Sequence, residues 1–312
     1  MQINEIPNDP ILTIWKNNYN KNLQEHMFST KKAKPIKFLL TNRFYQKCPI
    51  VLVAAGPSID KNIELLKQYK NNCLILCVDV VLFKLIENDI EPDFVVSIDP
   101  SDSISRFWKD IETENLTFIC PTTVSIASLK NWKGNVFFFN QNDIEGSKKQ
   151  ELLKQLTKPT AGFGELLNRF FVGATMYQIS LLFIPSVIIL VGYDFAFTSG
   201  KPYCDGFLER KLYDLNNIGM DILKQREYAP HAIVSIDDTI VGTTNSLQLY
   251  KDTLVELVNS CKIKTINSTE GGILTECMRM PLKDSLEEFC KNEIKKHDVA
   301  TAAKRKKKKK RR

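Results

Sequence analysis

Short apolar runs alternate with helical patterns over most of this chain. The runs expected to be strands are Ile50–Ala55, Cys73–Val78, Phe94–Ile98, Leu116–Cys120, Val136–Phe139, Val187–Val191 and Lys264–Ile266. Continuous apolar runs, rather than alternating ones, are typical of strands that helices cover on both faces of a parallel sheet. The pattern therefore predicts an α/β, Rossmann-like fold with a mainly parallel sheet and helices on both faces.

Helical periodicity places helices between these runs and sets the expected domain limits. The expected helices are Asp60–Tyr69, Val80–Asn88, Gly164–Phe183, Phe207–Lys224 and Ser246–Ser260. Residues 1–45 are polar, with a helical stretch over Ile11–Lys37, and are expected to form a flanking segment. We expect one main domain over residues 46–285. A C-terminal helix and a disordered Lys/Arg tail are expected over residues 286–312.

Charge is unevenly distributed along the 312 residues. The chain has 43 Lys and Arg against 36 Asp and Glu, but nine of the basic residues are consecutive, Lys304–Arg312. Without this tail the net charge is about −2. Such a tail favours contact with an anionic membrane surface, or is simply solvated. The rest of the chain shows no basic stripe with interleaved aromatic residues, so a nucleic-acid partner is not expected.

Cysteine and histidine usage points to a reducing compartment. None of the eight Cys forms a Cys-x-x-Cys pair, and there are only three His. No secretory signal pattern or apolar run of membrane-spanning length is present. These features predict buried, reduced thiols and no structural zinc site. The expected location is cytoplasmic, with a peripheral association at the inner membrane surface through Lys304–Arg312.

The first expected strand ends in Gly56-Pro57-Ser58, and a helix follows at once. The free N–H groups and partial positive charge of a helix N-terminus favour an anion such as a nucleotide phosphate. The segment is neither the Gly-x-Gly-x-x-Gly of dinucleotide folds nor a Walker A loop. Because a plain strand–turn–helix junction also has this composition, both interpretations stay open.

Polar residues follow most of the other expected strands. They are Asp79, Asp99, Asn140, Asp194 and Asn267-Ser268. Ligands of open parallel sheets bind beyond the carboxyl ends of the strands. Asp79 and Asp99 are therefore candidates for holding a ribose hydroxyl or Mg²⁺, or for capping the next helix. Thr175, expected near a helix start, suits a phosphate or a sugar.

Several segments, taken in order, resemble one known family. They are Ala54-Ala55-Gly56-Pro57-Ser58, Asp79, Pro92–Pro100, Ile188–Thr198 and Gly242–Gly272. Together they are similar to the motility accessory factor family, which shares its domain with 6-hydroxymethylpterin pyrophosphokinases and is related to bacterial sialyltransferases. The resemblance implies a Rossmann-like transferase that attacks a nucleotide-activated donor with a hydroxyl. The sialyltransferases carry a catalytic His where this chain has Thr243.

The leading hypothesis is a glycosyltransferase that moves a nonulosonic acid from a CMP-activated donor, without metal, to flagellin Ser/Thr or a glycan. In it Asp99 and Asp194 are catalytic. The nucleotide and its phosphate are held by Gly56, Pro57, Ser58, Asp79, Thr175, Asn267 and Ser268. One alternative is a pyrophosphokinase using ATP and Mg²⁺, with Asp79 and Asp99 as metal ligands. The other is a non-catalytic nucleotide-binding or scaffold protein.

Overall fold

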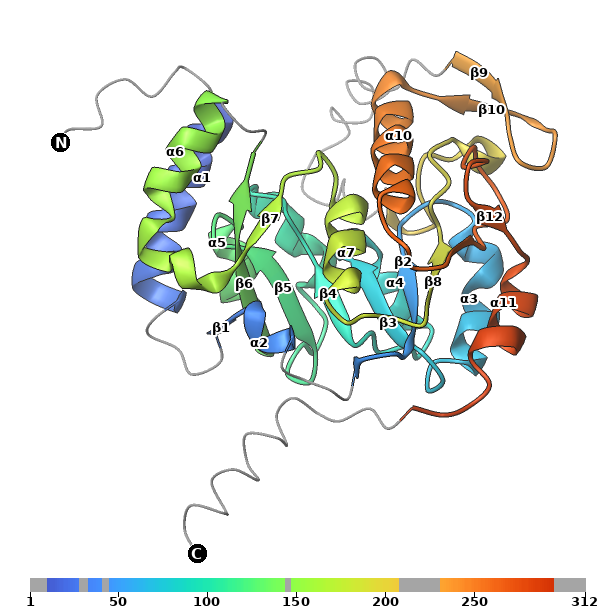
Figure 1. Ribbon diagram of the computed structural model, residues 1–312, viewed down its shortest axis with the longest axis horizontal. Helices are drawn as coiled ribbons and strands as arrows, with labels where there is room; N and C mark the ends of the chain where they lie inside the picture. The colour runs from blue at the N-terminus through green and yellow to red at the C-terminus, as the bar shows by residue number, and fades with distance from the viewer. Residues whose placement is uncertain (1–9, 28–32, 41–44, 144–146, 208–230, 295–312) are drawn as a thin grey trace, which may run out of the picture.

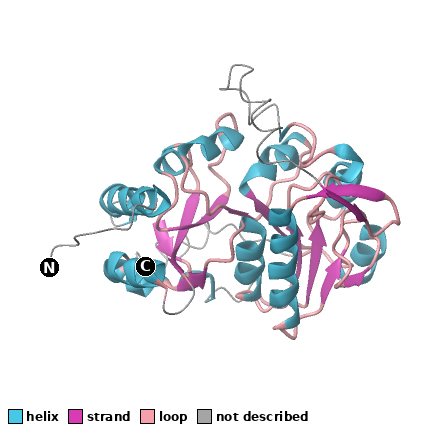
Figure 2. Ribbon diagram, turned by 90° about the horizontal axis from the view of Figure 1, so that it is seen from above, coloured by secondary structure: helices cyan, strands magenta, loops and turns pink. Residues whose placement is uncertain are grey.

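The computed structural model of the protein describes residues 10–27, 33–40, 45–143, 147–207 and 231–294. In this part of the chain one parallel sheet has the order β1-β6-β5-β4-β3-β2-β8-β11-β12, and β7 pairs with β6 beside this path. Helices lie on both faces of the sheet (Figure 1 and Figure 2). The predicted α/β, Rossmann-like fold is therefore confirmed.

All seven predicted strands are present, with ends that differ by up to three residues. They are β2 (Pro49–Val53), β3 (Leu74–Val78), β4 (Phe94–Val96), β5 (Thr117–Pro121), β6 (Asn135–Asn142), β8 (Val187–Val191) and β11 (Thr265–Asn267). Every residue of β2, β3 and β8 is buried, because helices cover both faces of these central strands. Burial of this kind explains their uninterrupted apolar sequences.

The helical elements connect these strands. They are α1 (Pro10–Asn22) with a π-helical turn η1 (Leu23–Met27), α2 (Lys37–Leu40), α3 (Ile59–Gln68), η3 (Asp79–Val81), α4 (Leu82–Glu87), η4 (Asp102–Trp108), α5 (Ile126–Lys130), α6 (Lys148–Leu156), η5 (Lys158–Phe163), α7 (Val172–Leu181), η6 (Thr198–Gly200), α10 (Asn245–Asn259) and α11 (Leu282–Phe289). Helices α7 and α10 pack against each other in front of the sheet in Figure 1, and α1 packs against α6 at one end.

Five strands were not predicted from the sequence. They are β1 (Ala33–Pro35), β7 (Glu165–Leu167), β9 (His231–Val234), β10 (Ile240–Thr243) and β12 (Met278–Arg279). Strands β9 and β10 form a separate antiparallel hairpin, and the other three are two or three residues long. Short strands away from the sheet centre are only partly buried, so they lack the continuous apolar pattern of β2 or β8.

Two predicted helices are wrong in part. The stretch 164–183 was expected to be one helix, but it contains β7, a bend and then α7. Gly164 and Phe170 have φ values of 95° and 67°, which a right-handed helix excludes. The stretch Ile11–Lys37 was also expected to be helical, but β1 lies within it and pairs with β6. Residues before position 46 therefore contribute a strand to the main sheet.

Two other predictions fall outside the described residues. They are most of the helix Phe207–Lys224 and the basic tail Lys304–Arg312. In the part of the chain that the structure does describe, no helix combines the length and the apolar character needed to cross a membrane.

Candidate functional site

The candidate site lies where the strand order of the sheet reverses, between β2 and β8. From β2 the chain runs through β3 to β6 on one side, and it then returns to β8 on the other side of β2. Strands β2 and β8 pair from Pro49↔Val187 to Val53↔Val191, so their carboxyl ends lie next to each other. In open parallel sheets this switch point is where ligands bind.

The Gly56-Pro57-Ser58 loop is bonded to the loop after β8. The Gly56 N–H donates to the Gly192 carbonyl at 2.8 Å, and the Ser58 hydroxyl donates to the Asp194 carboxylate at 2.6 Å. A Cβ added at Gly56 would overlap Asp194 Oδ1, so only glycine allows this close approach. The loop therefore joins two strands at the switch point.

The N–H donors expected to bind phosphate at this loop are used within the protein. The Ser58 N–H faces the Asp194 carboxylate at 3.3 Å, and the next three N–H groups donate to the carbonyls of residues 56–58. Among the described residues, Gly56 lines the cavity discussed below, whereas Pro57 and Ser58 do not. Phosphate binding by this loop stays a prediction, but the loop has no free first-turn donor to offer.

Asp194 is the centre of this contact. Both of its carboxylate oxygens accept hydrogen bonds, from Ser58 and from the Thr198 hydroxyl at 2.6 Å, and the residue is 1% exposed. Burial raises the pKa of Asp194 to about 6, although the bonds from Ser58 and Thr198 oppose the shift. We call Asp194, Ser58 and Thr198 the Asp194 cluster. This geometry gives Asp194 a positioning role, and its predicted catalytic role stays untested.

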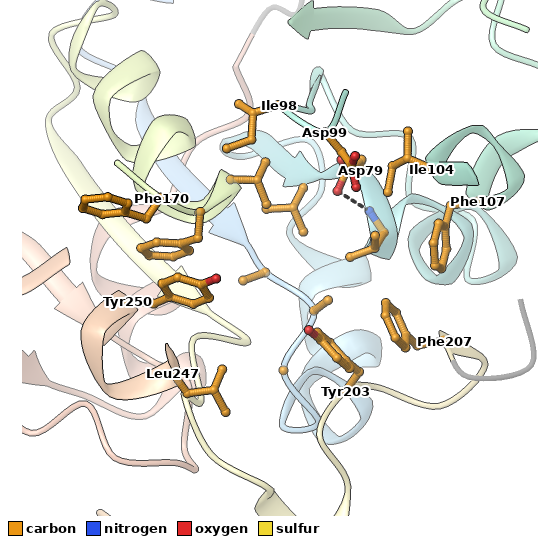
Figure 3. Close-up of a pocket in the computed structure, with 18 of the residues that line it drawn as sticks. Asp79, Ile98, Asp99, Ile104, Phe107, Phe170, Tyr203, Phe207, Leu247 and Tyr250 are labelled. Atoms are coloured by element: carbon orange, nitrogen blue, oxygen red, sulfur yellow. Dashed lines mark hydrogen bonds between the residues drawn. The ribbon is translucent and has the colours of Figure 1, made fainter. Parts of the chain in front are cut away.

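Asp79 and Asp99 come together at the wall of the cavity, at the ends of neighbouring strands β3 and β4 (Figure 3). Asp79 is 3% exposed and accepts a hydrogen bond from the Val80 N–H at 2.8 Å. Asp99 is half-buried and accepts one from the Ser101 N–H at 2.7 Å. Burial, assisted by the neighbouring Asp99 carboxylate, raises the pKa of Asp79 to about 7. The pair can accept a proton or contribute two ligands to a divalent cation.

Three further predicted residues, Thr175, Asn267 and Ser268, lie outside the cavity wall, as does Thr243. Thr175 lies in the first half of α7 and is 2% exposed. Asn267 donates to the Leu274 carbonyl at 2.7 Å, and Ser268 shares a hydrogen bond with Ser285 at 2.8 Å. Thr243 donates to the Phe195 carbonyl at 2.8 Å and is fully buried. None of these four lines the cavity, so a direct contact with nucleotide would need a rearrangement.

The cavity itself has a volume of about 780 Å³, and several aromatic residues contribute to its wall. Phe171 stacks on Tyr250 with ring centroids 4.8 Å apart, and Tyr203 stacks on Phe207 at 3.9 Å. Phe170 and Tyr250 lie on one side of the close-up, and Tyr203 and Phe207 lie on another (Figure 3). Flat aromatic walls of this kind suit a nucleobase or the apolar face of a sugar.

A helix N-terminus also opens onto the cavity. Phe171, Val172 and Gly173, where α7 begins, line its wall. The first N–H groups of a helix have no partner inside the helix, and the helix dipole adds partial positive charge there. Within the described residues, α7 rather than α3 therefore offers the N–H donors for an anion. The sequence analysis expected a phosphate or a sugar near Thr175, in this same turn, although it expected the helix to begin already at Gly164.

Asp79 also makes the stability of the protein depend on pH. Its folded pKa lies above the ordinary value of 3.8, so the folded protein retains a proton that the unfolded chain loses. The free energy of unfolding is therefore expected to fall as the pH rises from about 4 to about 7. Asp79→Asn should be more stable than wild type by on the order of 2–4 kcal/mol at pH 8. Urea denaturation at pH 4 and pH 8 measures the free energy of unfolding of both proteins. An equal difference between Asp79→Asn and wild type at the two pH values would contradict the prediction.

A metal ion at the Asp79–Asp99 pair would need further ligands from the substrate. Among the described residues, no group of three or more His, Cys, Asp or Glu is placed to hold a metal ion. Mg²⁺ often takes only one or two protein carboxylates and completes its shell with water and phosphate oxygens. Asp79 and Asp99 are consistent with that mode of binding.

Comparisons with known proteins agree with this architecture. The structure of the MAf glycosyltransferase from Magnetospirillum magneticum AMB-1 matches with a TM-score of 0.56 and 15% identity, over 95% of this chain and 45% of that one. This chain thus spans less than half the length of that enzyme, and the likeness concerns the fold. No curated protein matches the chain. The family model described as "6-hydroxymethylpterin diphosphokinase MptE-like" matches residues 17–200, more than half of the chain. The chain therefore belongs to the 6-hydroxymethylpterin diphosphokinase MptE-like family.

Proposed function

We propose that the protein is a nucleotide-dependent glycosyltransferase that moves a nonulosonic acid from a CMP-activated donor to a hydroxyl acceptor. The observation that carries the proposal is the Asp79–Asp99 pair at the rim of an aromatic cavity at the switch point. A carboxyl group with a pKa of about 7 exchanges protons readily at neutral pH. The fold shared with a glycosyltransferase over 95% of this chain is consistent with the proposal.

In this proposal the nucleotide lies between the aromatic walls. The base stacks on the Phe171–Tyr250 or the Tyr203–Phe207 side. The donor phosphate faces the first turn of α7 at Val172 and Gly173, where N–H groups stabilise its negative charge as it departs. Asp194 also lines the cavity, and the Asp194 cluster holds the loops after β2 and β8 together.

The transfer step follows from the position of Asp99. Its half-buried carboxylate borders the cavity and accepts the proton of the acceptor hydroxyl. The acceptor oxygen forms a bond to the anomeric carbon of the sugar, while the bond from that carbon to the phosphate oxygen breaks and CMP leaves. Asp79, more deeply buried, modulates the charge beside Asp99. Much of the rate enhancement would come from holding the acceptor and donor in line.

The carboxylate pair itself also favours a second candidate function. A 6-hydroxymethylpterin pyrophosphokinase would use Asp79 and Asp99 to bind Mg²⁺ and so hold the phosphates of ATP, and the matching family model bears the diphosphokinase name. A planar pterin would suit the same aromatic walls. In that reaction the pterin hydroxyl attacks the β-phosphorus of ATP, and AMP leaves.

Thermal-shift measurements with CMP, CDP, UDP, AMP and ATP, each with Mg²⁺ or EDTA, separate the two functions. Stabilisation by CMP in EDTA is the expected result, with a free-energy gain of about 2.7 kcal/mol at 100 times Kd. Stabilisation by ATP only with Mg²⁺ would favour the pyrophosphokinase. If no nucleotide raises the temperature of unfolding, both enzymatic proposals fail. The non-catalytic scaffold would then be the better interpretation.

A further inference from the structure

The cavity continues away from Asp79 toward the side where α1 packs on α6. This end is lined by Trp15 of α1, Gln141 of β6 and Asn168 after β7. We propose that it is the acceptor subsite and that it binds a saccharide, rather than a Ser or Thr of a protein. The proposal rests on the proposed transferase function, and it names the class of acceptor.

Gln141 is the first indication of a ligand. It lines the cavity, and it is only 5% exposed. Its Oε1 accepts a hydrogen bond from the Thr123 hydroxyl at 2.8 Å, which leaves the two N–H donors of Nε2 without an acceptor among the described residues. These donors belong to a side chain that lines the cavity, where a ligand oxygen can accept from them.

Asn168, which directly follows β7 and is half-buried, also has a bonded amide oxygen. The Asn168 Oδ1 accepts from the Phe170 N–H at 3.1 Å, so its amide N–H groups are again the part left for a ligand. The Asn168 N–H donates to the Asn142 carbonyl at 2.8 Å and thus continues the pairing of β6 with β7. Because the paired strands fix both backbones, Gln141 and Asn168 form a preorganised pair of amide donors.

Trp15 adds an aromatic surface to these two amides. It is 6% exposed, lines the cavity and has an indole Nε1 without a partner among the described residues. Amide groups that bond hydroxyls and an aromatic ring that packs on C–H groups together match the mixed surface of a sugar.

Contacts from α1 connect this subsite to Asp99. The Asn18 Nδ2 group, one helical turn after Trp15, donates to the Pro100 carbonyl at 2.8 Å and to the Thr123 carbonyl at 3.2 Å. Pro100 directly follows Asp99, and Thr123 is the residue that holds Gln141. A saccharide bound by Gln141 and Asn168 would therefore lie beside the loop that carries the proposed base.

Saturation-transfer NMR on the full chain tests the subsite with N-acetylglucosamine, galactose, lactose and an unmodified Ser/Thr peptide as probes. At least one saccharide should bind wild type. Its Kd should rise about tenfold in Gln141→Leu and in Asn168→Ala, because each loses roughly one hydrogen bond to the ligand. Asn142→Ala is the matched control, since Asn142 is the next residue of β6 but does not line the cavity, and its Kd should not change.

Three results would overturn the saccharide subsite. They are binding of the peptide alone, saccharide binding that both Gln141→Leu and Asn168→Ala leave unchanged, and no binding of any saccharide probe. Far-ultraviolet circular dichroism of each variant verifies that it is folded, and Asn168→Ala remains informative if the loss of the Thr123 partner unfolds Gln141→Leu. The nucleotide thermal shift is independent of these probes, so it shows separately whether the proposed transferase function fails.

Discussion

Gly272→Ala is expected to destabilise the folded protein by more than about 4 kcal/mol. Gly272 has a φ of 77°, and a Cβ added there would overlap the backbone Cα, C and O atoms of Asp194. This backbone cannot move away easily, because the Ile273 N–H donates to the Asp194 carbonyl at 2.9 Å and the Asp194 side chain holds Ser58 and Thr198. Urea denaturation followed by circular dichroism measures the loss.

Gly200→Ala is the matched control for this substitution. Gly200 has nearly the same φ, 75°, but a Cβ added there would meet no atom within 4 Å. Gly200→Ala should therefore lower the free energy of unfolding only by the cost of placing an alanine in the left-handed backbone conformation, about 1–2 kcal/mol. The difference between the two variants isolates the contact with Asp194. Equal losses would show that the loop at Gly272 relaxes freely and that the close packing around Asp194 is unimportant.

Asp99→Asn is expected to lower the rate of transfer about 10²- to 10³-fold, because it removes the proposed general base. An asparagine at this position can still accept the hydrogen bond from the Ser101 N–H, so the loop should keep its conformation. The measurement is kcat for transfer of the sugar from its CMP donor, with CMP release followed in parallel. Nucleotide binding should change little, since the base acts on the acceptor.

Asp102→Asn provides the control for the loss of a nearby carboxylate, at the start of η4. Asp102 is exposed and does not line the cavity, and an amide oxygen can still accept from Ser125 and Ala127. Its transfer rate should stay within about twofold of wild type. A rate for Asp99→Asn as high as that of Asp102→Asn would remove Asp99 from the mechanism. The general base would then have to be another residue.

The sequence predicted the central strands well and the peripheral elements poorly. Strands β2, β3 and β8 are buried on both faces, so their apolar runs are unbroken and easily recognised. Strand β7 depends instead on its pairing with β6 and on the positive φ of Gly164. Neither feature leaves a periodic signal, because both arise from contacts between distant parts of the chain.

A general rule of parallel sheets predicted where two of the candidate residues lie. Asp79 and Asp99 follow neighbouring strands, and the structure brings them together at the cavity. The bond between Ser58 and Asp194 could not be predicted, since it joins residues 136 positions apart and depends on the order of the strands. The amide pair of Gln141 and Asn168 was missed for the same reason, because it needs the unpredicted pairing of β6 with β7.

The bonds of the Asp194 cluster have a consequence for the order of folding. Ser58 and Asp194 are 136 positions apart, so their contact requires the closure of a very long loop and the prior pairing of β2 with β8. Contacts of such high sequence separation form late and slow the folding of a domain. A chain still emerging from the ribosome can complete its first strands, but it cannot close the loop around Asp194 until Gly272 has been synthesised.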